Sequence, residues 1–267
     1  RCISSGFNLF NYFHIYMDHY SSLKSLIGND LECHYFDSLE STSSFLNSLP
    51  SSNITQLCVT REQTQGKGQH GREWLSQKDG SILLSIRQTF GIDINLSGLS
   101  LVVGLAIIRA LEKECKIDGF KIKWPNDIYF REAKLAGILL ENSIQARSQS
   151  VIIGVGLNYH LEQEMSCDIP WIDLSKITKT LPDIHELTAS IINNILSMSA
   201  YFKLNGLSDL LSQWDQYDML KGAKLKSIEF GKSFEGEVVG ISNQGALKVL
   251  TENGTKELYS SKNIEYI

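Results

Sequence analysis

The glycine-rich stretch of residues 63–74 holds the residue types best suited to chemistry in this chain. Its glycines at positions 66, 68 and 71 let the backbone come close to a ligand, and Lys67 places a cation among them. Backbone N–H groups beside a cation bind anions such as phosphate or carboxylate. The stretch therefore predicts an anion-binding loop.

The three glycines also fit a second interpretation. Gly66, Gly68 and Gly71 satisfy the dinucleotide-binding pattern Gly-x-Gly-x-x-Gly, in which the loop opens a helix. Here the loop is followed by alternating apolar residues at 82, 84 and 86, which predict a strand. The phosphate-binding loop of nucleoside triphosphatases needs Ser or Thr directly after its lysine, whereas Lys67 is followed by Gly68. Both nucleotide-binding classes are therefore excluded.

Three further stretches carry polar groups that adenylate or phosphoryl chemistry uses. Residues 41–43 are a cluster of hydroxyls, Lys123 and Lys134 flank a turn with Asp127, and residues 154–158 read Gly-Val-Gly-Leu-Asn. Lysines neutralise phosphate charge and a carboxylate can hold Mg²⁺, because such reactions depend mainly on charge neutralisation and positioning. No pair of nucleophile and base stands out. Each feature is weak alone, and only their combination is specific.

Composition narrows the classes of partner. The 267 residues carry a net charge of −5 with no run of like charge, which argues against a nucleic-acid-binding surface. The spacing of the five cysteines and six histidines predicts reduced thiols and no built-in transition-metal site. Residues 1–30 are rich in aromatic side chains, but polar residues interrupt them too often for a signal peptide or a membrane span.

The elements that must position these residues form a mixed pattern. Strands are predicted over residues 31–36, 54–60, 81–88, 120–123, 128–130, 134–140 and 151–157, and helices over 101–116, 183–204 and 207–217. Ser41 and Thr42 supply N-cap hydroxyls for a short helix, and Ser97 or Ser100 is expected to cap the helix that begins at Leu101. Neighbouring strands joined by short turns predict an α+β fold rather than a doubly wound parallel one.

The composition changes after Met219 to short strands with tight turns, predicted at 223–230, 234–241, 246–250 and 256–259. They predict a small barrel-like domain. The expected organisation is an N-terminal extension of unassigned role at 1–30, a catalytic domain at 31–218 and a small β domain at 219–267. Since no low-complexity linker separates the last two, we expect them to be in contact.

Five motifs follow one another along the chain. They are Ser41-Thr42, the segment 62–74, Lys123-Trp124-Pro125-Asn126-Asp127, Lys134-Leu135-Ala136-Gly137-Ile138-Leu139 and Gly154-x-Gly156-x-Asn158. In this order, and with a small β domain after them, they resemble the biotin protein ligases, the biotin–[carboxylase] ligase family. The resemblance covers residues 31–267.

The resemblance implies a catalytic domain related to class II aminoacyl-tRNA synthetases, followed by a small Src-homology-3-like β-barrel. It implies that biotin and MgATP give biotinyl-5′-AMP and pyrophosphate, and that a lysine of a biotin carrier domain, such as that of acetyl-CoA carboxylase, then takes the biotinyl group. Mg²⁺ is expected to arrive with ATP near Asp127. The expected location is cytoplasmic, without nucleic acid or membrane partners, and a homodimer is a candidate assembly.

Carried over position by position, the resemblance divides the candidate residues between the two substrates. The biotin residues are Ser41, Thr42, Ser43, Gln63, Lys67, Gly68, Gln69, Lys134 and Gly137. The ATP residues are Gly66, Arg72, Trp74, Lys123, Asn126, Asp127 and Asn158. The residues expected to be catalytic are Lys134, Lys67, Lys123 and Asp127. A buried urea needs donors and acceptors, and a fixed cation stabilises the charge that develops in both half-reactions.

Two positions depart from the common family pattern. Lys67 stands where many members have Arg, and a lysine cannot make the planar bidentate contact. Gln69 stands where many members have an arginine that helps to retain the reactive adenylate, so we expect this chain to release biotinyl-AMP more readily. Some members also repress transcription through an N-terminal winged helix-turn-helix. Residues 1–30 are too short for one and carry no basic recognition helix, so a ligase without repressor function is expected.

Three other interpretations stay open on sequence alone. A lipoate- or octanoyl-protein ligase shares the catalytic fold, although the glycine loop with Trp74 and the C-terminal barrel favour biotin. A non-catalytic biotin-responsive regulator would not need the whole set of Lys67, Lys123, Asp127 and Lys134. A DNA-binding repressor would be distinguished by binding to a biotin operator.

Overall fold

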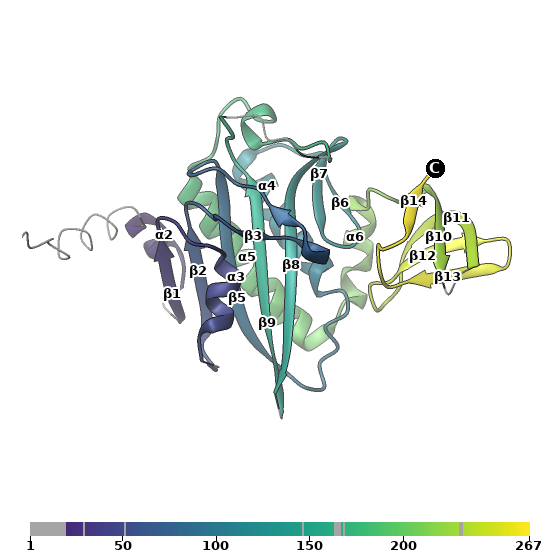
Figure 1. Cartoon of the computed structure of the whole chain (residues 1–267), viewed down its shortest axis with the longest axis horizontal. Helices are drawn as coiled ribbons and strands as arrows, with labels where there is room; N and C mark the ends of the chain where they lie inside the picture. The colour runs from purple at the N-terminus through teal and green to yellow at the C-terminus, as the bar shows by residue number, and fades with distance from the viewer. Residues whose placement is uncertain are drawn as a thin grey trace, which may run out of the picture.

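The computed structural model describes residues 20–28, 30–50, 52–145, 147–162, 167, 169–229 and 232–267. Its centre is a seven-stranded sheet with the order β1-β2-β5-β9-β8-β7-β6 (Figure 1). These strands are β1 (Leu31–Phe36), β2 (Thr55–Thr60), β5 (Ser81–Gly91), β6 (Phe120–Lys123), β7 (Asp127–Phe130), β8 (Ala133–Gln145) and β9 (Ser148–Asn158). β1 and β2 are parallel, and the other neighbours pair antiparallel.

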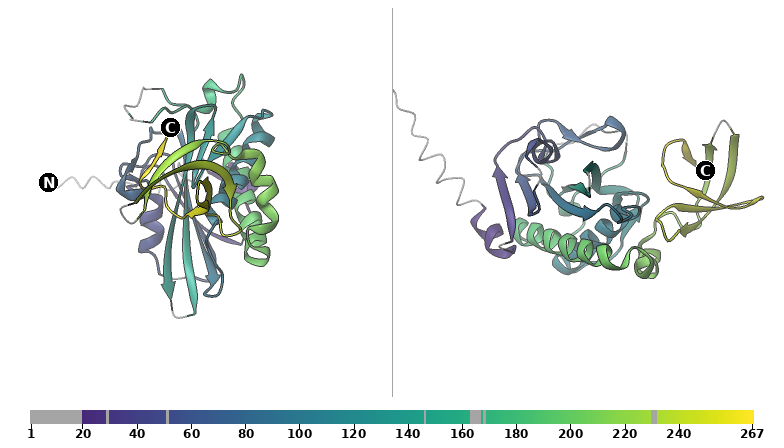
Figure 2. Two further views of the ribbon diagram at one scale, coloured as in Figure 1. Left: turned by 90° about the vertical axis from the view of Figure 1, so that its right-hand side faces the viewer. Right: turned by 90° about the horizontal axis from the view of Figure 1, so that it is seen from below.

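Helices lie on both faces of this sheet. α4 (Leu99–Cys115) and α5 (Ile184–Asn205) pack against each other and cover one face, whereas the short α3 (Thr42–Ser48) lies on the other face over β2, β5 and β9 (Figures 1 and 2). The remaining helical segments of the described chain are α2 (Ser21–Leu26), η1 (Gln69–Gly71), η2 (Leu174–Lys176), η3 (Ser208–Leu210) and α6 (Leu211–Tyr217). The face with α3 is the one left open for a ligand.

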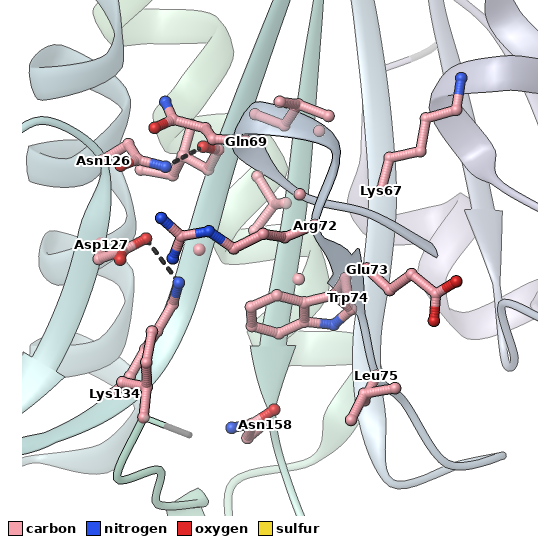
Figure 3. A pocket seen from close by; sticks show the side chains of 18 of the residues that line it. Lys67, Gln69, Arg72, Glu73, Trp74, Leu75, Asn126, Asp127, Lys134 and Asn158 are labelled. Atoms are coloured by element: carbon pink, nitrogen blue, oxygen red, sulfur yellow. Dashed lines mark hydrogen bonds and ion pairs between the residues drawn. The ribbon is translucent and has the colours of Figure 1, made fainter. Parts of the chain in front are cut away.

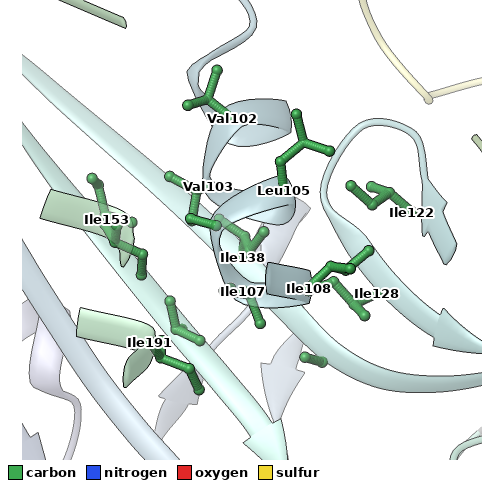
Figure 4. Close-up of a cluster of buried hydrophobic side chains, with 14 of the residues drawn as sticks. Val102, Val103, Leu105, Ile107, Ile108, Ile122, Ile128, Ile138, Ile153 and Ile191 are labelled. Atoms are coloured by element: carbon green, nitrogen blue, oxygen red, sulfur yellow. The ribbon is translucent and has the colours of Figure 1, made fainter. Parts of the chain in front are cut away.

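The main hydrophobic core lies between the sheet and the α4–α5 layer (Figure 4). Ile108 of α4 lies toward Ile122 of β6 and Ile128 of β7, and all three side chains are buried. α4 is apolar on nearly every side, as expected for a helix enclosed between a sheet and a second helix. This core fixes the strands whose ends carry the polar motifs.

The predicted α+β architecture is confirmed, and for the elements that were predicted the errors concern their ends. Strand β8 runs to Gln145 rather than 140, because its polar end still pairs with β9 after the apolar pattern has stopped. The predicted serine cap of α4 is wrong. The helix begins at Leu99 after Gly98, which has a left-handed φ of 87°, and no side chain caps it. The Ser100 hydroxyl instead donates to the Pro125 carbonyl at 3.0 Å.

The C-terminal domain is a five-stranded antiparallel sheet with the order β13-β12-β11-β10-β14. Its strands are β10 (Lys224–Glu229), β11 (Lys232–Ile241), β12 (Leu247–Thr251), β13 (Gly254–Leu258) and β14 (Ile264–Tyr266). The sequence prediction missed β14, a three-residue strand that pairs with β10. The expected contact between the domains is confirmed, since the Trp124 indole donates to the Gly245 carbonyl at 2.9 Å.

Part of the predicted N-terminal extension packs with the domain of the central sheet. Leu23 of α2 is fully buried, and the Tyr20 hydroxyl donates to the Phe36 carbonyl of β1 at 2.9 Å. Residues 1–19 lie outside the described residues. Within the described part of the chain, no helix combines the length and apolar character needed to cross a membrane.

Candidate active site

A cavity of about 330 Å³ lies on the open face of the central sheet. Its walls come from α3, from the glycine loop with the short pair β3 (Gly66–Lys67) and β4 (Glu73–Trp74), and from the turn between β6 and β7 (Figure 3). The predicted site residues that line it are Ser41, Thr42, Ser43, Gln63, Lys67, Gly68, Gln69, Arg72, Trp74, Lys123, Asn126, Asp127, Lys134, Gly137 and Asn158. Gly66 is not in the lining, because it lies behind Trp74.

One end of the cavity is lined by hydroxyl and amide groups. Thr42, the first residue of α3, donates to the Gln63 Oε1 atom through its backbone N–H at 2.8 Å and through its hydroxyl at 3.0 Å. The Ser41 and Ser43 hydroxyls lie 3.1 Å apart, and the Thr42 and Ser85 hydroxyls lie 2.8 Å apart. All four hydroxyl side chains are buried. This end can both donate to and accept from a buried polar ring.

The middle of the cavity contains an ion pair. Lys134 of β8 places its Nζ atom 2.8 Å from the Asp127 Oδ1 atom of β7 (Figure 3). Both side chains are about one-fifth exposed, at 21% and 20%. The same ammonium lies 5.5 Å from the centroid of the Trp74 ring. A cation held from two sides can stabilise negative charge in the cavity without first having to be ordered.

Lys123 is held by two aromatic rings. The Lys123 ammonium lies 5.4 Å from the centroid of the Tyr129 ring and 4.7 Å from that of Tyr266, which belongs to the C-terminal domain. Burial lowers the pKa of Lys123, Asp127 acts against this effect, and the positive charge of Lys134 adds to it. The cation is therefore partly desolvated and ready to bind an anion.

The Trp74 indole rests on two glycines that face each other across β8 and β9, Gly137 and Gly156. A Cβ atom built on Gly156 would lie 2.4 Å from the Trp74 Cε2 atom, and one on Gly137 would lie 2.9 Å from Cζ3. The resemblance placed Gly137 among the biotin residues, and in the structure the Trp74 indole lies directly against it. The glycine pair is what lets the ring lie flat against the sheet.

The side chains of the two cationic residues in the glycine loop, Lys67 and Arg72, point in different directions. In Figure 3, Arg72 extends toward the pair of Asp127 and Lys134, whereas Lys67 extends away from it. Both side chains are exposed. Arg72 is thus the loop cation directed to the centre of the cavity in this structure.

Two family models match the chain in order. A model described as the Biotin/lipoate A/B protein ligase family matches residues 35–158, and one described as the Biotin protein ligase C terminal domain matches residues 227–262. The chain belongs to the biotin protein ligase family. The second model separates it from lipoate ligases, because that model describes a domain of the biotin enzymes.

Individual biotin protein ligases are similar over most of this chain. The bifunctional ligase/repressor BirA of Escherichia coli (strain K12) is 33% identical over 202 residues, which are 74% of this chain and 62% of that protein. The biotin–[acetyl-CoA-carboxylase] ligase of Mycobacterium tuberculosis is 26% identical over 194 residues, or 71% of each chain. This chain thus spans less than two thirds of the length of the first relative.

A solved biotin protein ligase has the same fold. The Aquifex aeolicus enzyme in complex with biotin and ATP superimposes with a TM-score of 0.74, at 29% identity, over 88% of this chain and 98% of that one. The mixed sheet and the C-terminal β domain therefore occur together in this family.

Several residues of the cavity wall were absent from the sequence prediction, and four of them carry a hydroxyl group. Ser85, Tyr129, Ser261 and Tyr266 line the cavity with the predicted residues. Ser85 had a signal in the sequence, since it is a polar residue within the apolar run of β5 and is fully buried. No pattern in the sequence marks Ser261 or Tyr266 as a site residue, because only the packing of the C-terminal domain brings them to the cavity.

Proposed function

We propose that this biotin protein ligase activates biotin with ATP and then transfers the biotinyl group to a lysine of a biotin carrier domain. In the first step a biotin carboxylate oxygen attacks the α-phosphorus of ATP, and pyrophosphate leaves. In the second step the carrier amine attacks the biotinyl carbonyl, and AMP leaves. The observation that carries the proposal is the ion pair of Lys134 and Asp127, set in one cavity with the hydroxyl cluster and with Lys123.

The hydroxyl end of the cavity supports biotin as the acid. A ureido ring has two N–H donors and one carbonyl acceptor, which complement the oxygens and hydroxyls of Ser41, Thr42, Ser43 and Ser85. The dithiolane of lipoate and the tail of octanoate offer no such donors. Placing either against this buried polar group would leave its hydroxyls unsatisfied, which costs free energy.

The cations support an adenylate as the intermediate. We assign Lys134 to the carboxylate and α-phosphoryl groups and Lys123 to the outer phosphates, since each has its ammonium at the cavity wall. Asp127 can contribute one carboxylate oxygen to a Mg²⁺ ion that is otherwise bound by phosphate oxygens and water, a donor set that suits this ion. Mg²⁺ would neutralise phosphate charge. Among the described residues, no group of three His, Cys, Asp or Glu could hold a metal alone.

Relatives support the assignment of both substrates. The Aquifex aeolicus structure holds biotin and ATP, and the Mycobacterium tuberculosis relative is named for acetyl-CoA carboxylase. We therefore propose the biotin carrier domain of an acetyl-CoA carboxylase type enzyme as the acceptor, in the cytoplasm.

ATP–pyrophosphate exchange tests this function. Purified protein with Mg²⁺ is assayed with biotin, lipoate and octanoate in turn, and then with a biotin carrier domain. We expect exchange with biotin alone and label transfer to the carrier lysine. Exchange with lipoate or octanoate would assign the chain to the sister activity, and biotin binding without exchange would identify a sensor.

Tyr266→Leu is expected to raise the KM for ATP by about 3- to 10-fold, because the loss of a partly desolvated cation–π contact costs about 0.5–2 kcal/mol. Tyr266→Phe keeps the ring and should stay within about twofold of wild type. Steady-state exchange rates against ATP concentration measure the effect. Tyr259→Leu is the matched control, since Tyr259 is 62% exposed on the same domain. Equal values for the Leu and Phe variants of Tyr266 would show that the ring does not act through Lys123.

Gln69→Arg is expected to slow the release of biotinyl-AMP by about 10-fold or more, because a hydrogen bond between charged groups contributes about 1.5–3 kcal/mol. Gln69 lines the cavity, so an arginine there could reach the adenylate phosphate. The release rate is measured by rapid filtration after a single turnover without carrier. Gln65→Arg, at an exposed position of the same loop, is the control. Equal rates of biotinyl-AMP release from wild type and Gln69→Arg would refute the expectation that Gln69 makes this chain release the adenylate more readily.

A further inference from the structure

Arg87 is a buried cation on β5 that the proposed mechanism does not use. Its side chain is 7% exposed. The guanidinium donates to the Gln56 Oε1 atom at 2.6 Å, to the Leu46 carbonyl at 2.7 Å, to the Leu49 carbonyl at 3.1 Å and to the Pro50 carbonyl. None of these four acceptors is a carboxylate. A buried charge is therefore satisfied by neutral oxygens alone.

Three of these acceptors mark one end of α3. Leu46 lies in the last turn of the helix, Leu49 is its C-cap residue, and Pro50 follows. The last carbonyls of a helix lack partners within the helix and carry partial negative charge, so a cation there is favourable. Burial lowers the pKa of Arg87, and Glu32 acts against this effect. Glu32 itself accepts from the Gln56 Nε2 atom at 2.8 Å, which holds the amide in place for Arg87.

The same strand also holds the other end of α3. Ser85 precedes Arg87 by two residues and therefore points to the same face of β5. Its hydroxyl lies 2.8 Å from that of Thr42, the first residue of α3. β5 thus contacts the helix at its N-terminus through Ser85 and at its C-terminus through Arg87.

These polar contacts matter because α3 is short and its apolar contacts are confined to a small cluster, beside which Phe45 also meets the rings of His34 and Phe36. A helix of seven residues is not stable alone in water. The buried apolar cluster beneath it consists of Leu46, Cys58 and Ile152 and is separate from the main core. A small apolar contact can slide or tilt, whereas four directed hydrogen bonds from a rigid guanidinium fix both position and angle.

We propose that Arg87 is a positioning residue for the biotin end of the cavity. By fixing the C-terminal end of α3, it sets where the N-terminal end of that helix places Ser41, Thr42 and Ser43. The lysines and the aspartate assigned to the phosphates come from β6, β7 and β8, and Arg87 donates a hydrogen bond to none of them. This inference rests on the proposed function, since it assigns biotin to the hydroxyl cluster.

The test compares the KM values for biotin and ATP in the exchange assay. Arg87→Met is expected to raise the KM for biotin by about 10-fold or more, while the KM for ATP stays within about twofold. Arg109→Met is the matched control, because Arg109 is exposed on α4 and donates to Gln213. Guanidinium ion at millimolar concentration should lower the biotin KM of Arg87→Ala toward the wild-type value and leave Arg109→Ala unchanged.

Gln56→Met is a milder variant for the case in which Arg87→Met does not fold. It removes one of the four acceptors and should raise the biotin KM by about threefold, again without an effect on ATP. Equal increases in both KM values, or an unchanged biotin KM in a folded variant, would overturn the inference. Exchange by the wild-type chain is measured first, so a failure of the proposed function appears there and not in the comparison of variants.

Discussion

Lys134→Ala is expected to lower the rate of biotin-dependent ATP–pyrophosphate exchange by about 100- to 1000-fold, which corresponds to about 3–4 kcal/mol of lost transition-state stabilisation. Lys134 is held by Asp127 at 2.8 Å and lies beside Trp74, so its charge is fixed before any ligand arrives. The α-phosphoryl oxygens already carry charge in ATP, and further charge develops there as the carboxylate attacks. The effect should therefore fall mainly on kcat, measured at saturating biotin and ATP.

Two controls separate loss of the cation from damage to the site. Lys113→Ala removes a lysine that is 73% exposed and pairs with a neighbouring glutamate, and it should leave exchange unchanged. The double variant Lys134→Ala with Asp127→Asn removes the carboxylate that the single change leaves unpaired. If the double variant recovered most of the activity, the low activity of Lys134→Ala would come from the unpaired charge of Asp127 and not from the missing cation. A Lys134→Ala rate within about twofold of wild type would remove Lys134 from the mechanism.

Gly156→Ala is expected to raise the KM for ATP by about 5- to 150-fold, because overpacking of a close contact costs about 1–3 kcal/mol. The added methyl would lie 2.4 Å from Trp74 Cε2 and 2.6 Å from its Nε1 atom, so the indole must leave its place on the sheet. The ring that we assign to the adenylate would then no longer lie flat beside Lys134. Exchange rates against ATP concentration measure the change, and tryptophan fluorescence reports the displacement.

Gly154→Ala is the matched control for this variant. Gly154 lies on the same strand and the same face, and a Cβ atom there would meet its nearest neighbours at 3.6 Å, an ordinary van der Waals distance. Replacing glycine by alanine restricts the backbone of the unfolded chain equally at the two positions. The variants therefore differ in the clash with Trp74, which only Gly156→Ala creates. Similar KM values for the two alanine variants would contradict the proposed role of Gly156 in leaving room for the Trp74 ring.

The sequence predicted the strands of the central sheet well, since each is a short apolar run with turn residues at its ends. β1 and β6 match their predicted bounds. The turn between β6 and β7 was predicted from Trp-Pro-Asn-Asp, and it brings Asp127 to Lys134 of the next strand. The cap of α4 was predicted wrongly, because a nearby serine is a common cap but the hydroxyl of Ser100 found the Pro125 carbonyl instead.

The α+β architecture and the set of lysine, aspartate and hydroxyl residues that line one cavity were predictable from the sequence. These follow from alternation, turn chemistry and charge, which act between residues close in the chain. Three sets of contacts are visible only in the folded structure: those of Ser85 and Arg87 with α3, of Gly156 with Trp74 and of Tyr266 with Lys123. Each of these contacts joins residues at least 37 positions apart. The sequence gives the type of side chain at each position. The residue that this side chain contacts depends on how the sheet and the C-terminal domain pack.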